Sequence, residues 1–210
     1  MARTPKKSSG VTVGREPVST LRIIGGDWRS RRVPIADRPG LRPTPDRVRE
    51  TVFNWLAPRL PGAVCADLFA GTGALGIEAL SRGAASTVFI ESDGEATKAI
   101  DAALATLGAG ERARVARGDA TRADELLAAD SLDIVFIDPP FSAQLHGAAL
   151  AGIARALRRG AYLYLEYPLA EDTAIADRLA ADYEVLKTSR AGSVGFCLAT
   201  PRQTDPEATT

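Results

Sequence analysis

Short apolar runs alternate with helix-like stretches along the central part of the chain, and this alternation constrains the fold more than any other feature. The apolar runs that indicate buried strands lie at 64–69, 87–91, 114–117, 132–137 and 162–166. The candidate helices lie at 74–82, 95–107, 123–128, 144–157 and 173–181. Strands joined by helices pair in parallel through right-handed crossovers, so we expect a doubly wound α/β sheet.

Two more strand-like runs, at 184–189 and 195–200, follow the last helical stretch. The link at 190–193 between them is too short for a crossover, so it permits only an antiparallel pair. We therefore expect this pair at one end of a mostly parallel sheet.

A small hairpin is predicted before the sheet, because runs at 21–24 and 31–35 flank a glycine-containing turn. Its basic side chains are expected to surround Trp28, and they are Arg22, Arg29, Arg31 and Arg32. Further on, Thr44 stands where it can N-cap a helix, with Pro45 at the first helical position. The apolar face of that helix consists of Val48, Val52, Trp55 and Leu56.

Charge is distributed unevenly although the formal net charge is zero. Residues 1–60 carry 13 basic and 5 acidic side chains, and residues 61–210 carry 13 and 21. A basic segment on an acidic body is typical of a protein that meets nucleic acid, although a solvated basic tail has the same composition. We expect a disordered basic tail (1–19), a nucleic-acid-contacting hairpin and helix (20–60), a main domain (61–200) and a flexible tail (201–210).

The stretch 67–76 follows a strand, opens a helix and contains Gly-x-Gly-x-x-Gly at Gly71, Gly73 and Gly76. Such glycines let the backbone turn tightly and lie against a ligand at the helix N-terminus. Glu91 ends the next strand, where a carboxylate can accept hydrogen bonds from ribose hydroxyls. The spacing predicts a nucleoside cofactor, while glycine punctuation of an ordinary βα turn is the alternative.

Asp67 favours S-adenosylmethionine over a dinucleotide, because a carboxylate before the glycines attracts an ammonium group and repels a pyrophosphate. A turn-capping carboxylate is the alternative for Asp67. Asp119 ends the third strand at the same edge, where it is either an acceptor for the adenine amino group or a turn residue. The expected cofactor site consists of Asp67, Phe69, Ala70, Gly71, Thr72, Gly73, Glu91, Ser92, Asp119 and Ala120.

The run 132–137 delivers the sequence Asp138-Pro139-Pro140-Phe141 to the edge where doubly wound sheets bind their ligands. The two prolines have no backbone N–H to donate. The groups that the loop offers are therefore acceptors, namely the Asp138 carboxylate and the Pro139 carbonyl. Two acceptors suit the two hydrogens of an exocyclic base amine, and Phe141 offers a face on which a base can stack. A proline-rich turn that closes a strand is the structural alternative.

The few cysteine and histidine residues argue against a disulfide, a metal site and a histidine base. Cys65 and Cys197 lie in separate apolar runs, and His146 is the one histidine, so we expect buried thiols and no metal site. We expect His146 to be a surface or loop residue and not a base. The absence of a long apolar segment predicts a cytoplasmic protein.

The chain resembles the bacterial 16S rRNA guanine-N2 methyltransferases over roughly residues 21–200. The resemblance rests on residues 22–26, 42–56, 67–76, 78–84 and 138–141, of which 42–56 is the most specific stretch. It implies a seven-stranded class I methyltransferase fold that acts on one guanine of 16S rRNA, within a small-subunit particle. Separately, we expect a monomer. The resemblance also implies that Thr44 and Arg47 lie near the methionine end of the cofactor. The basic lead of 19 residues departs from the family pattern.

The expected reaction is a single in-line methyl transfer without a metal or a covalent intermediate, with the catalytic residues Asp138, Pro139, Pro140 and Phe141. The expected RNA contacts are Arg22, Trp28, Arg29, Arg31, Arg32 and Arg42. Adenine N6 or cytosine N4 of RNA or DNA suits the same acceptor pair, and only the family resemblance selects guanine N2. An NAD-dependent oxidoreductase leaves residues 138–141 without a role, and a non-catalytic RNA-binding module leaves the glycine loop without one.

Overall fold

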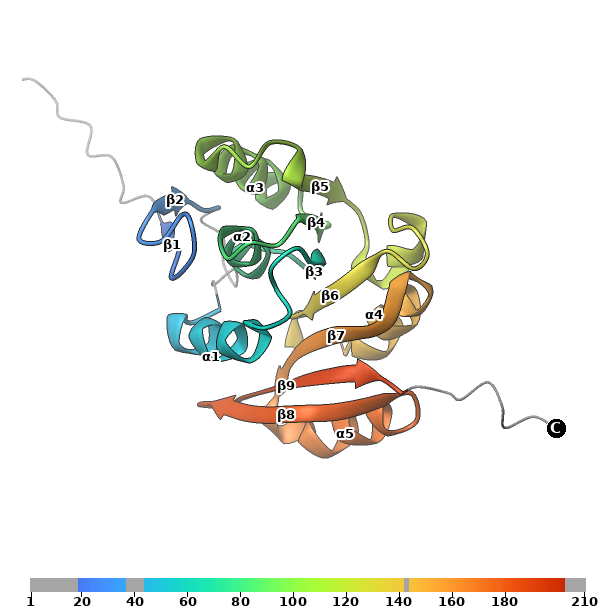
Figure 1. Ribbon diagram of the computed structural model, residues 1–210. Coiled ribbons are helices and arrows are strands. Elements are labelled where there is room, and N and C mark those ends of the chain that lie inside the picture. Colours follow the sequence, from blue (N-terminus) through green and yellow to red (C-terminus); the bar gives the residue numbers. More distant parts are fainter. Residues whose placement is uncertain (1–18, 37–43, 142–143, 203–210) are drawn as a thin grey trace, which may run out of the picture.

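A seven-stranded sheet forms the centre of the protein (Figure 1). The computed structural model describes residues 19–36, 44–141 and 144–202. The strands lie in the order β5-β4-β3-β6-β7-β9-β8. Their bounds are Val64–Leu68 (β3), Ser86–Glu91 (β4), Ala113–Arg117 (β5), Leu132–Ile137 (β6), Leu157–Pro168 (β7), Tyr183–Ala191 (β8) and Val194–Pro201 (β9). β3 to β7 pair in parallel and β9 is antiparallel to both its neighbours, so the predicted fold class is confirmed.

Helices cover both faces of the sheet (Figure 1). One face carries α1 (Asp46–Leu56), α2 (Ala74–Ser81) and α3 (Gly94–Leu107). The other carries α4 (His146–Ile153), α5 (Asp172–Ala180) and the 3-10 helix η2 (Ala120–Glu125). Shorter 3-10 turns lie at Gly110–Arg112 (η1), Ala154–Ala156 (η4) and Leu169–Glu171 (η5). Within the described ranges, no helix is long and apolar enough to cross a bilayer.

Three expected elements differ from the structure. The α-helix expected at 123–128 is the 3-10 helix η2, which starts earlier because the Asp119 side chain accepts a hydrogen bond from the Thr121 N–H. The helix expected at 144–157 ends at Ile153, since η4 follows and Leu157 already belongs to β7. β7 also starts five residues before the expected strand, in an irregular stretch where its pairing with β6 shifts.

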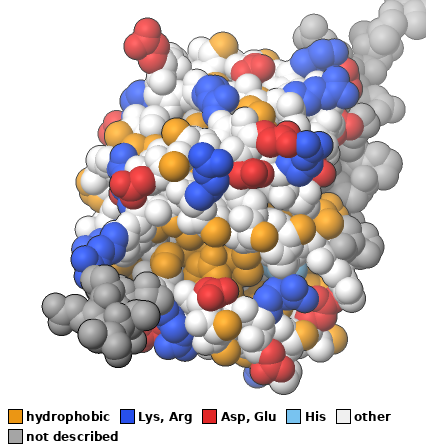
Figure 2. Space-filling model, turned by 90° about the vertical axis from the view of Figure 1, so that its right-hand side faces the viewer, with side chains coloured by type: hydrophobic (Ala, Val, Ile, Leu, Met, Phe, Trp, Pro, Cys, Tyr) orange, Lys and Arg blue, Asp and Glu red, His pale blue; other side chains and the backbone are white. Residues whose placement is uncertain are grey.

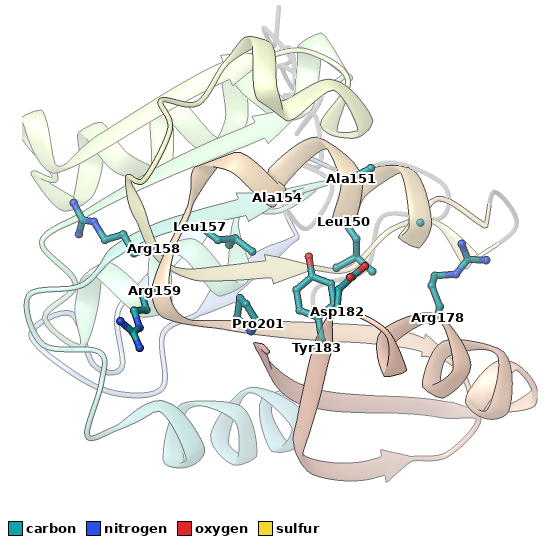
Figure 3. A pocket seen from close by; sticks show the side chains of 11 residues that line it. Leu150, Ala151, Ala154, Leu157, Arg158, Arg159, Arg178, Asp182, Tyr183 and Pro201 are labelled. Atoms are coloured by element: carbon teal, nitrogen blue, oxygen red, sulfur yellow. The ribbon is translucent and has the colours of Figure 1, made fainter. Parts of the chain in front are cut away.

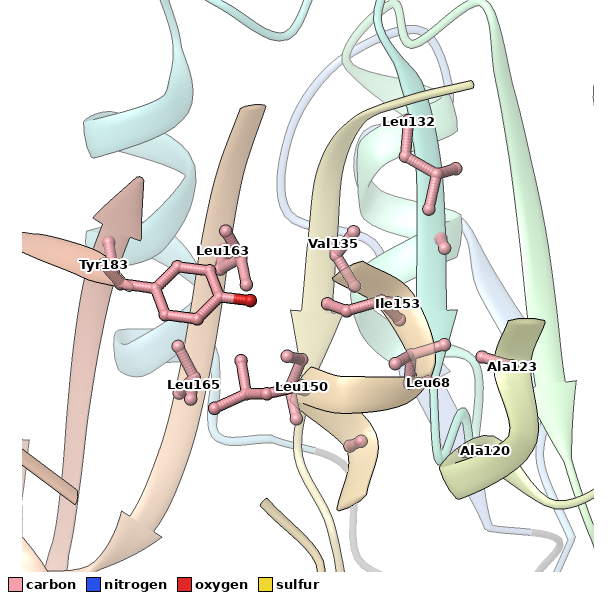
Figure 4. Close-up of a cluster of buried hydrophobic side chains, with 14 of the residues drawn as sticks. Leu68, Ala120, Ala123, Leu132, Val135, Leu150, Ile153, Leu163, Leu165 and Tyr183 are labelled. Atoms are coloured by element: carbon pink, nitrogen blue, oxygen red, sulfur yellow. The ribbon is translucent and has the colours of Figure 1, made fainter. Parts of the chain in front are cut away.

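The largest part of the core lies between the sheet and α4 (Figure 4). There Val135 of β6 and Leu163 and Leu165 of β7 face Leu150 and Ile153 of α4, and all five side chains are buried. The strand residues between them point to the opposite face, because side chains alternate along a strand. This alternation places Tyr164 and the residue two positions after it, Glu166, on the face that α1 covers.

The N-terminal hairpin, hereafter the basic hairpin, consists of β1 (Thr20–Arg22), β2 (Arg32–Pro34) and the turn between them. Its apolar side chains, with Trp28 among them, are buried in one cluster with residues of α2 and α3. The turn lies on the end of α2, where the Ser81 carbonyl accepts from the Asp27 N–H at 2.7 Å. At Gly26, with φ of 75°, a Cβ would lie 1.8 Å from that carbonyl oxygen, so a side chain there has no room.

A buried ion network joins the basic hairpin and α1 to the main domain. Glu78 of α2 is fully buried and accepts from the Ile24 N–H at 2.9 Å and the Gly25 N–H at 2.8 Å. Its carboxylate also pairs with Arg49 at 3.4 Å and with Arg82 at 2.7 Å. Such a group is stable inside a protein only when its charge is paired and its oxygens accept hydrogen bonds, and Glu78 meets both conditions.

Arg49 extends the network into the segment before α1. Its guanidinium is 1% exposed and donates to the carbonyl of Arg22 at 2.9 Å, to Asp46 at 2.7 Å and to the carbonyl of Thr44 at 3.1 Å. The position of Thr44 therefore depends on Arg49. The expectation that Thr44 N-caps the helix is wrong: Pro45 is the N-cap residue, and the Thr44 hydroxyl is directed to Asp138 instead.

Replacing Glu78 by alanine should leave Arg49 buried without its partner and two hairpin N–H groups without acceptors. Loss of one member of a buried pair costs about 3–5 kcal/mol of unfolding free energy, which chemical denaturation measures. Glu95→Ala is the matched control, because its pair with Lys98 is exposed and should contribute less than about 0.5 kcal/mol. Equal losses in the two variants would contradict the role given to Glu78.

Candidate functional site

The residues expected to form a site lie at the carboxyl ends of four neighbouring strands. Leu68 of β3 pairs with Ile137 of β6 on one side and with Ile90 of β4 on the other. Glu91, the last residue of β4, pairs with Arg117, the last residue of β5. The loops that follow these strands therefore meet at one edge of the sheet, hereafter the carboxyl edge.

The glycine loop between β3 and α2 turns by means of left-handed backbone conformations. Phe69, Gly71 and Gly73 have φ angles of 58°, 54° and 72°. A left-handed phenylalanine is strained, and strain of this kind is concentrated at ligand-binding sites. Two backbone hydrogen bonds hold the loop: the Ala70 N–H donates to the carbonyl of Ile90, and the Gly73 N–H donates to that of Ala70. Thr72 is buried in the loop.

Asp67 is buried at the end of β3 and accepts a hydrogen bond from the Gly76 N–H at 2.8 Å. Burial raises the pKa of Asp67 well above its usual range, and the charges of Asp138 and Glu91 raise it further. Gly76 is required here, since a Cβ would lie 2.3 Å from the Phe89 ring. Three carboxylates that repel one another create a site that favours a cationic ligand.

Glu91 and Asp119 belong to the same edge but have different surroundings. Glu91 is half-buried and accepts from the Gly71 N–H and the Asp93 N–H, both at 2.8 Å, with the Ser92 hydroxyl 3.3 Å away. A carboxylate has about four acceptor positions, so Glu91 retains capacity for a ligand hydroxyl. Asp119 is exposed and caps η2, and the hydrogen bonds from Thr121 lower its pKa. The next residue, Ala120, is buried.

The Asp-Pro-Pro-Phe loop starts directly after β6. Burial raises the pKa of Asp138 to about 6, against the opposing effect of the Thr44 hydroxyl, which donates to its Oδ2 at 3.4 Å. Pro139 is buried and Pro140 is exposed. The Phe141 side chain is 38% exposed, so part of its ring is accessible to a ligand. This arrangement presents a carboxylate and an aromatic surface beside the glycine loop.

Sequence reasoning missed Glu166, which contributes a further carboxylate from β7. Its side chain is 4% exposed and accepts from the Tyr164 hydroxyl at 2.8 Å. Burial raises the pKa of Glu166 to about 8, and the charge of Asp138 adds to the rise. A signal was present in the sequence, because Tyr162, Tyr164 and Glu166 alternate with leucines, which puts a carboxylate on an inward-facing position of a central strand.

The expectation that His146 is a surface or loop residue is wrong. His146 is the first residue of α4 and is 3% exposed. Its Nε2 lies 2.7 Å from the carbonyl oxygen of Glu166, so that nitrogen carries the hydrogen. Burial lowers the pKa of His146, which keeps the ring neutral. The histidine thus joins the start of α4 to β7 beside Glu166.

The residues expected to contact RNA differ in how exposed their side chains are. Arg22, Arg29, Arg31 and Arg32 are exposed on the basic hairpin, and Arg47 is exposed on α1. Trp28 is different: it is only 7% exposed and Arg112 lies 5.2 Å from its ring, so it has no open face for a base. This burial follows from the need of a small hairpin to pack its apolar side chains on α2 and α3. Arg42 lies outside the described residues.

A separate pocket of about 520 Å³ lies between α4 and α5 (Figure 3). Its lining includes Leu150 of α4 and Leu157, Tyr183 and Pro201, which lie at the opposite edge of the sheet from Asp138. Figure 2 shows a hollow on one face in which hydrophobic side chains gather. None of the expected site residues lines the pocket. Among the described residues, no cluster of histidine, cysteine and carboxylate side chains is suited to a metal ion.

The buried state of Glu166 predicts a dependence of stability on pH. Its pKa is higher in the folded than in the unfolded chain, so the folded chain holds more protons between about pH 5 and pH 8. The free energy of unfolding therefore decreases as the pH rises through this window, by at most about 1.4 kcal/mol per pH unit from this group. Glu166→Gln should remove that contribution, which denaturation at a series of pH values measures. Glu184→Gln, on exposed β8, should follow the wild type, and a Glu166→Gln curve parallel to the wild type would refute the prediction.

Comparisons with known proteins agree with this geometry. A family model described as conserved hypothetical protein 95 matches residues 21–199. The chain is 54% identical over 123 residues to ribosomal RNA small subunit methyltransferase D of Escherichia coli, which covers 58% of this chain and 60% of that relative. It is 40% identical over 152 residues to the protein of the same name from Haemophilus influenzae, which covers 70% and 78% of the two chains. The chain thus spans about 60% of the length of its Escherichia coli relative.

A solved structure with a related sequence has a similar fold. A solved structure named "putative methyltransferase yhhF" from Escherichia coli superposes with a TM-score of 0.74 at 39% identity. That comparison covers 89% of this chain and all of the solved one. The chain therefore belongs to the family described as conserved hypothetical protein 95 and is a relative of the ribosomal RNA small subunit methyltransferases D.

Proposed function

We propose that this chain transfers a methyl group from S-adenosylmethionine to the exocyclic N2 of one guanine in 16S ribosomal RNA. The observation that carries the proposal is the meeting of two loops at the carboxyl edge. The glycine loop, with Asp67 and Glu91, lies beside the Asp138 to Phe141 loop because β3 and β6 are neighbours. The relatives named as small-subunit rRNA methyltransferases support the choice of RNA.

The groups at the carboxyl edge fit S-adenosylmethionine by their chemistry. Asp67 and Glu91 suit an ammonium group and ribose hydroxyls, and Asp119 suits the adenine amino group. The glycine loop brings no basic side chain for a pyrophosphate, which argues against a dinucleotide. When bound, S-adenosylmethionine supplies an electrophilic methyl group. The family resemblance puts Thr44 and Arg47 near the methionine end of the cofactor; the 3.4 Å contact of Thr44 with Asp138 supports this for Thr44, and Arg47 lies in the first turn of α1.

The Asp138 loop suits a base amine. The lone pair of an exocyclic amine is delocalised into the ring, so the amine is a weak nucleophile. Acceptance of its two hydrogens by the Asp138 carboxylate and the Pro139 carbonyl favours a tetrahedral nitrogen with its lone pair directed at the methyl donor. Phe141 offers a surface for the extruded base. After transfer, the methylated nitrogen loses a proton, for which Asp138 is a nearby acceptor.

The exposed arginines of the basic hairpin are proposed to contact the RNA backbone. They lie on the same element whose backbone Glu78 and Arg49 hold against the catalytic domain. Arg31 also donates to the carbonyl of Thr106 on α3 at 2.8 Å, which orients this part of the hairpin. The target, we propose, lies in a small-subunit particle, where structured RNA presents many phosphates to such a surface.

Asp138→Ala should reduce methyl transfer at least about a hundredfold, because one of the two amine acceptors is lost from the reacting geometry. Transfer of a labelled methyl group to small ribosomal subunits that lack the modification measures the rate. Calorimetric titration should show nearly unchanged affinity for S-adenosylmethionine, since Asp67 and Glu91 remain.

Asp124→Ala is the control, because Asp124 is exposed on η2 and is not one of the proposed site residues. Full activity of Asp138→Ala would refute the catalytic assignment. Binding of NAD in preference to S-adenosylmethionine by the wild-type protein would refute the proposed cofactor.

Replacing Arg29, Arg31 and Arg32 by alanine should weaken RNA binding most at low salt. Each lost phosphate contact reduces the slope of log affinity against log salt by about 0.7–0.9, which filter binding over a range of salt concentrations measures. Arg155→Ala, an exposed arginine at the opposite edge of the sheet, is the control. Identical salt slopes for the triple variant and the wild type would exclude the basic hairpin as the RNA surface.

A further inference from the structure

Glu166 is a buried ionisable group that the proposed reaction does not yet use. It lies near the carboxyl end of β7, the strand next to the one that delivers Asp138. The groups that face it are Asp138 from the loop after β6, Thr44 from the segment before α1 and Tyr164 from its own strand. His146 of α4 binds its backbone carbonyl. Among the described residues, which do not include 37–43 or 142–143, none of the groups that face it is basic.

The hydroxyl of Thr44 lies between two carboxyl groups. Its oxygen is 3.4 Å from Asp138 Oδ2. It is also close enough to the Glu166 side chain to lower the pKa of that carboxyl group. A threonine hydroxyl has one hydrogen to donate and two lone pairs to accept with. It therefore satisfies two ionised carboxylates only in part, whereas it satisfies one carboxylate and one carboxylic acid completely.

The directions of the hydrogen bonds follow from this count. The Tyr164 hydroxyl donates to Glu166 Oε1 at 2.8 Å. If the other oxygen of Glu166 carries a proton, it can donate to Thr44 Oγ1, and Thr44 then donates its own hydrogen to Asp138 Oδ2. The chain of donors ends at Asp138, whose second oxygen stays available as an acceptor. Two neighbouring carboxyl groups in different surroundings often divide the roles of acid and carboxylate in this way.

We propose that Glu166 is a positioning residue, which as a neutral acid holds Asp138 through the Thr44 hydroxyl and leaves one Asp138 oxygen directed to the substrate amine. The inference rests on the proposed methyl transfer and goes beyond it. Glu166 itself touches neither the substrate nor the methyl donor. Ionisation of Glu166 takes away the donor that Thr44 needs and puts a second charge beside Asp138, so it loosens the acceptor.

The test is the pH profile of kcat and KM for methyl transfer by the wild type, Glu166→Gln and Glu166→Leu. In the wild type, kcat should rise as Asp138 ionises near pH 6 and fall again as Glu166 ionises near pH 8. Glutamine keeps a donor for Thr44 and an acceptor for Tyr164, so Glu166→Gln should retain kcat within about threefold and lose the decline at high pH. Leucine keeps neither, so kcat should fall on the order of tenfold or more with KM nearly constant.

Thr44→Val provides a second, nearly isosteric break in the same chain and should resemble Glu166→Leu in its effect on kcat. Thermal unfolding of each variant checks that the protein is folded. Glu184→Leu on exposed β8 is the matched control and should leave the whole profile unchanged. A Glu166→Gln variant that keeps the wild-type decline at high pH, or that loses as much kcat as Glu166→Leu, would overturn the inference. Wild-type kcat in Glu166→Leu would overturn it as well.

Infrared spectroscopy separates this inference from the proposed function. A protonated carboxylic acid has a carbonyl stretch that carboxylates lack. Buried Asp67, whose pKa is also raised, can contribute such a stretch to both proteins. The acid band assigned to Glu166 is therefore the one that appears at pH 7 in the difference spectrum of the wild type minus Glu166→Gln. This infrared measurement needs no substrate. Absence of methyl transfer by the wild type would therefore count against the proposed function, and absence of the acid band would count against Glu166 as the neutral acid.

Discussion

The buried carboxylate of Glu78 is the interaction on which the arrangement of the site depends. It joins α2 to two backbone N–H groups of the basic hairpin and to Arg49 of α1. Arg49 in turn holds the carbonyl of Thr44, and Thr44 donates to Asp138. The N-terminal extension is therefore part of the structure around the proposed site: the network that fixes the hairpin also holds Thr44 beside the Asp-Pro-Pro-Phe loop.

Electrostatics at the carboxyl edge explains why the site suits a cationic nucleoside. Asp67, Glu91 and Asp138 repel one another, and burial raises the pKa of Asp67 and Asp138. A cationic ligand bound at Asp67 and Glu91, as proposed, would relieve part of that repulsion. The exposed arginines of the basic hairpin lie on a different element from these carboxylates, so the proposed contacts to phosphates are separate from the acidic edge.

The sequence was sufficient to predict elements that depend on local patterns. Apolar runs and helical periods predicted the strands and their parallel order, and the glycine loop and residues 138–141 were placed at one edge by topology alone. Contacts across the fold were not predictable in this way. Thr44 does not cap its helix because Arg49 and Asp138 hold it elsewhere, and Trp28 is buried because the hairpin packs on α2. The surroundings of Glu166 and His146 depend on β7 and α4 meeting near Asp138.

The central claim is that the acceptor pair at Asp138 and Pro139 directs methylation to a guanine amine of 16S rRNA. The most direct measurement is mass spectrometry of the nucleosides released from small ribosomal subunits after incubation with the protein and S-adenosylmethionine that carries a deuterated methyl group. The label should appear in N2-methylguanosine from a single position of 16S rRNA. Label in N6-methyladenosine or N4-methylcytidine, or no label in the RNA, would contradict it.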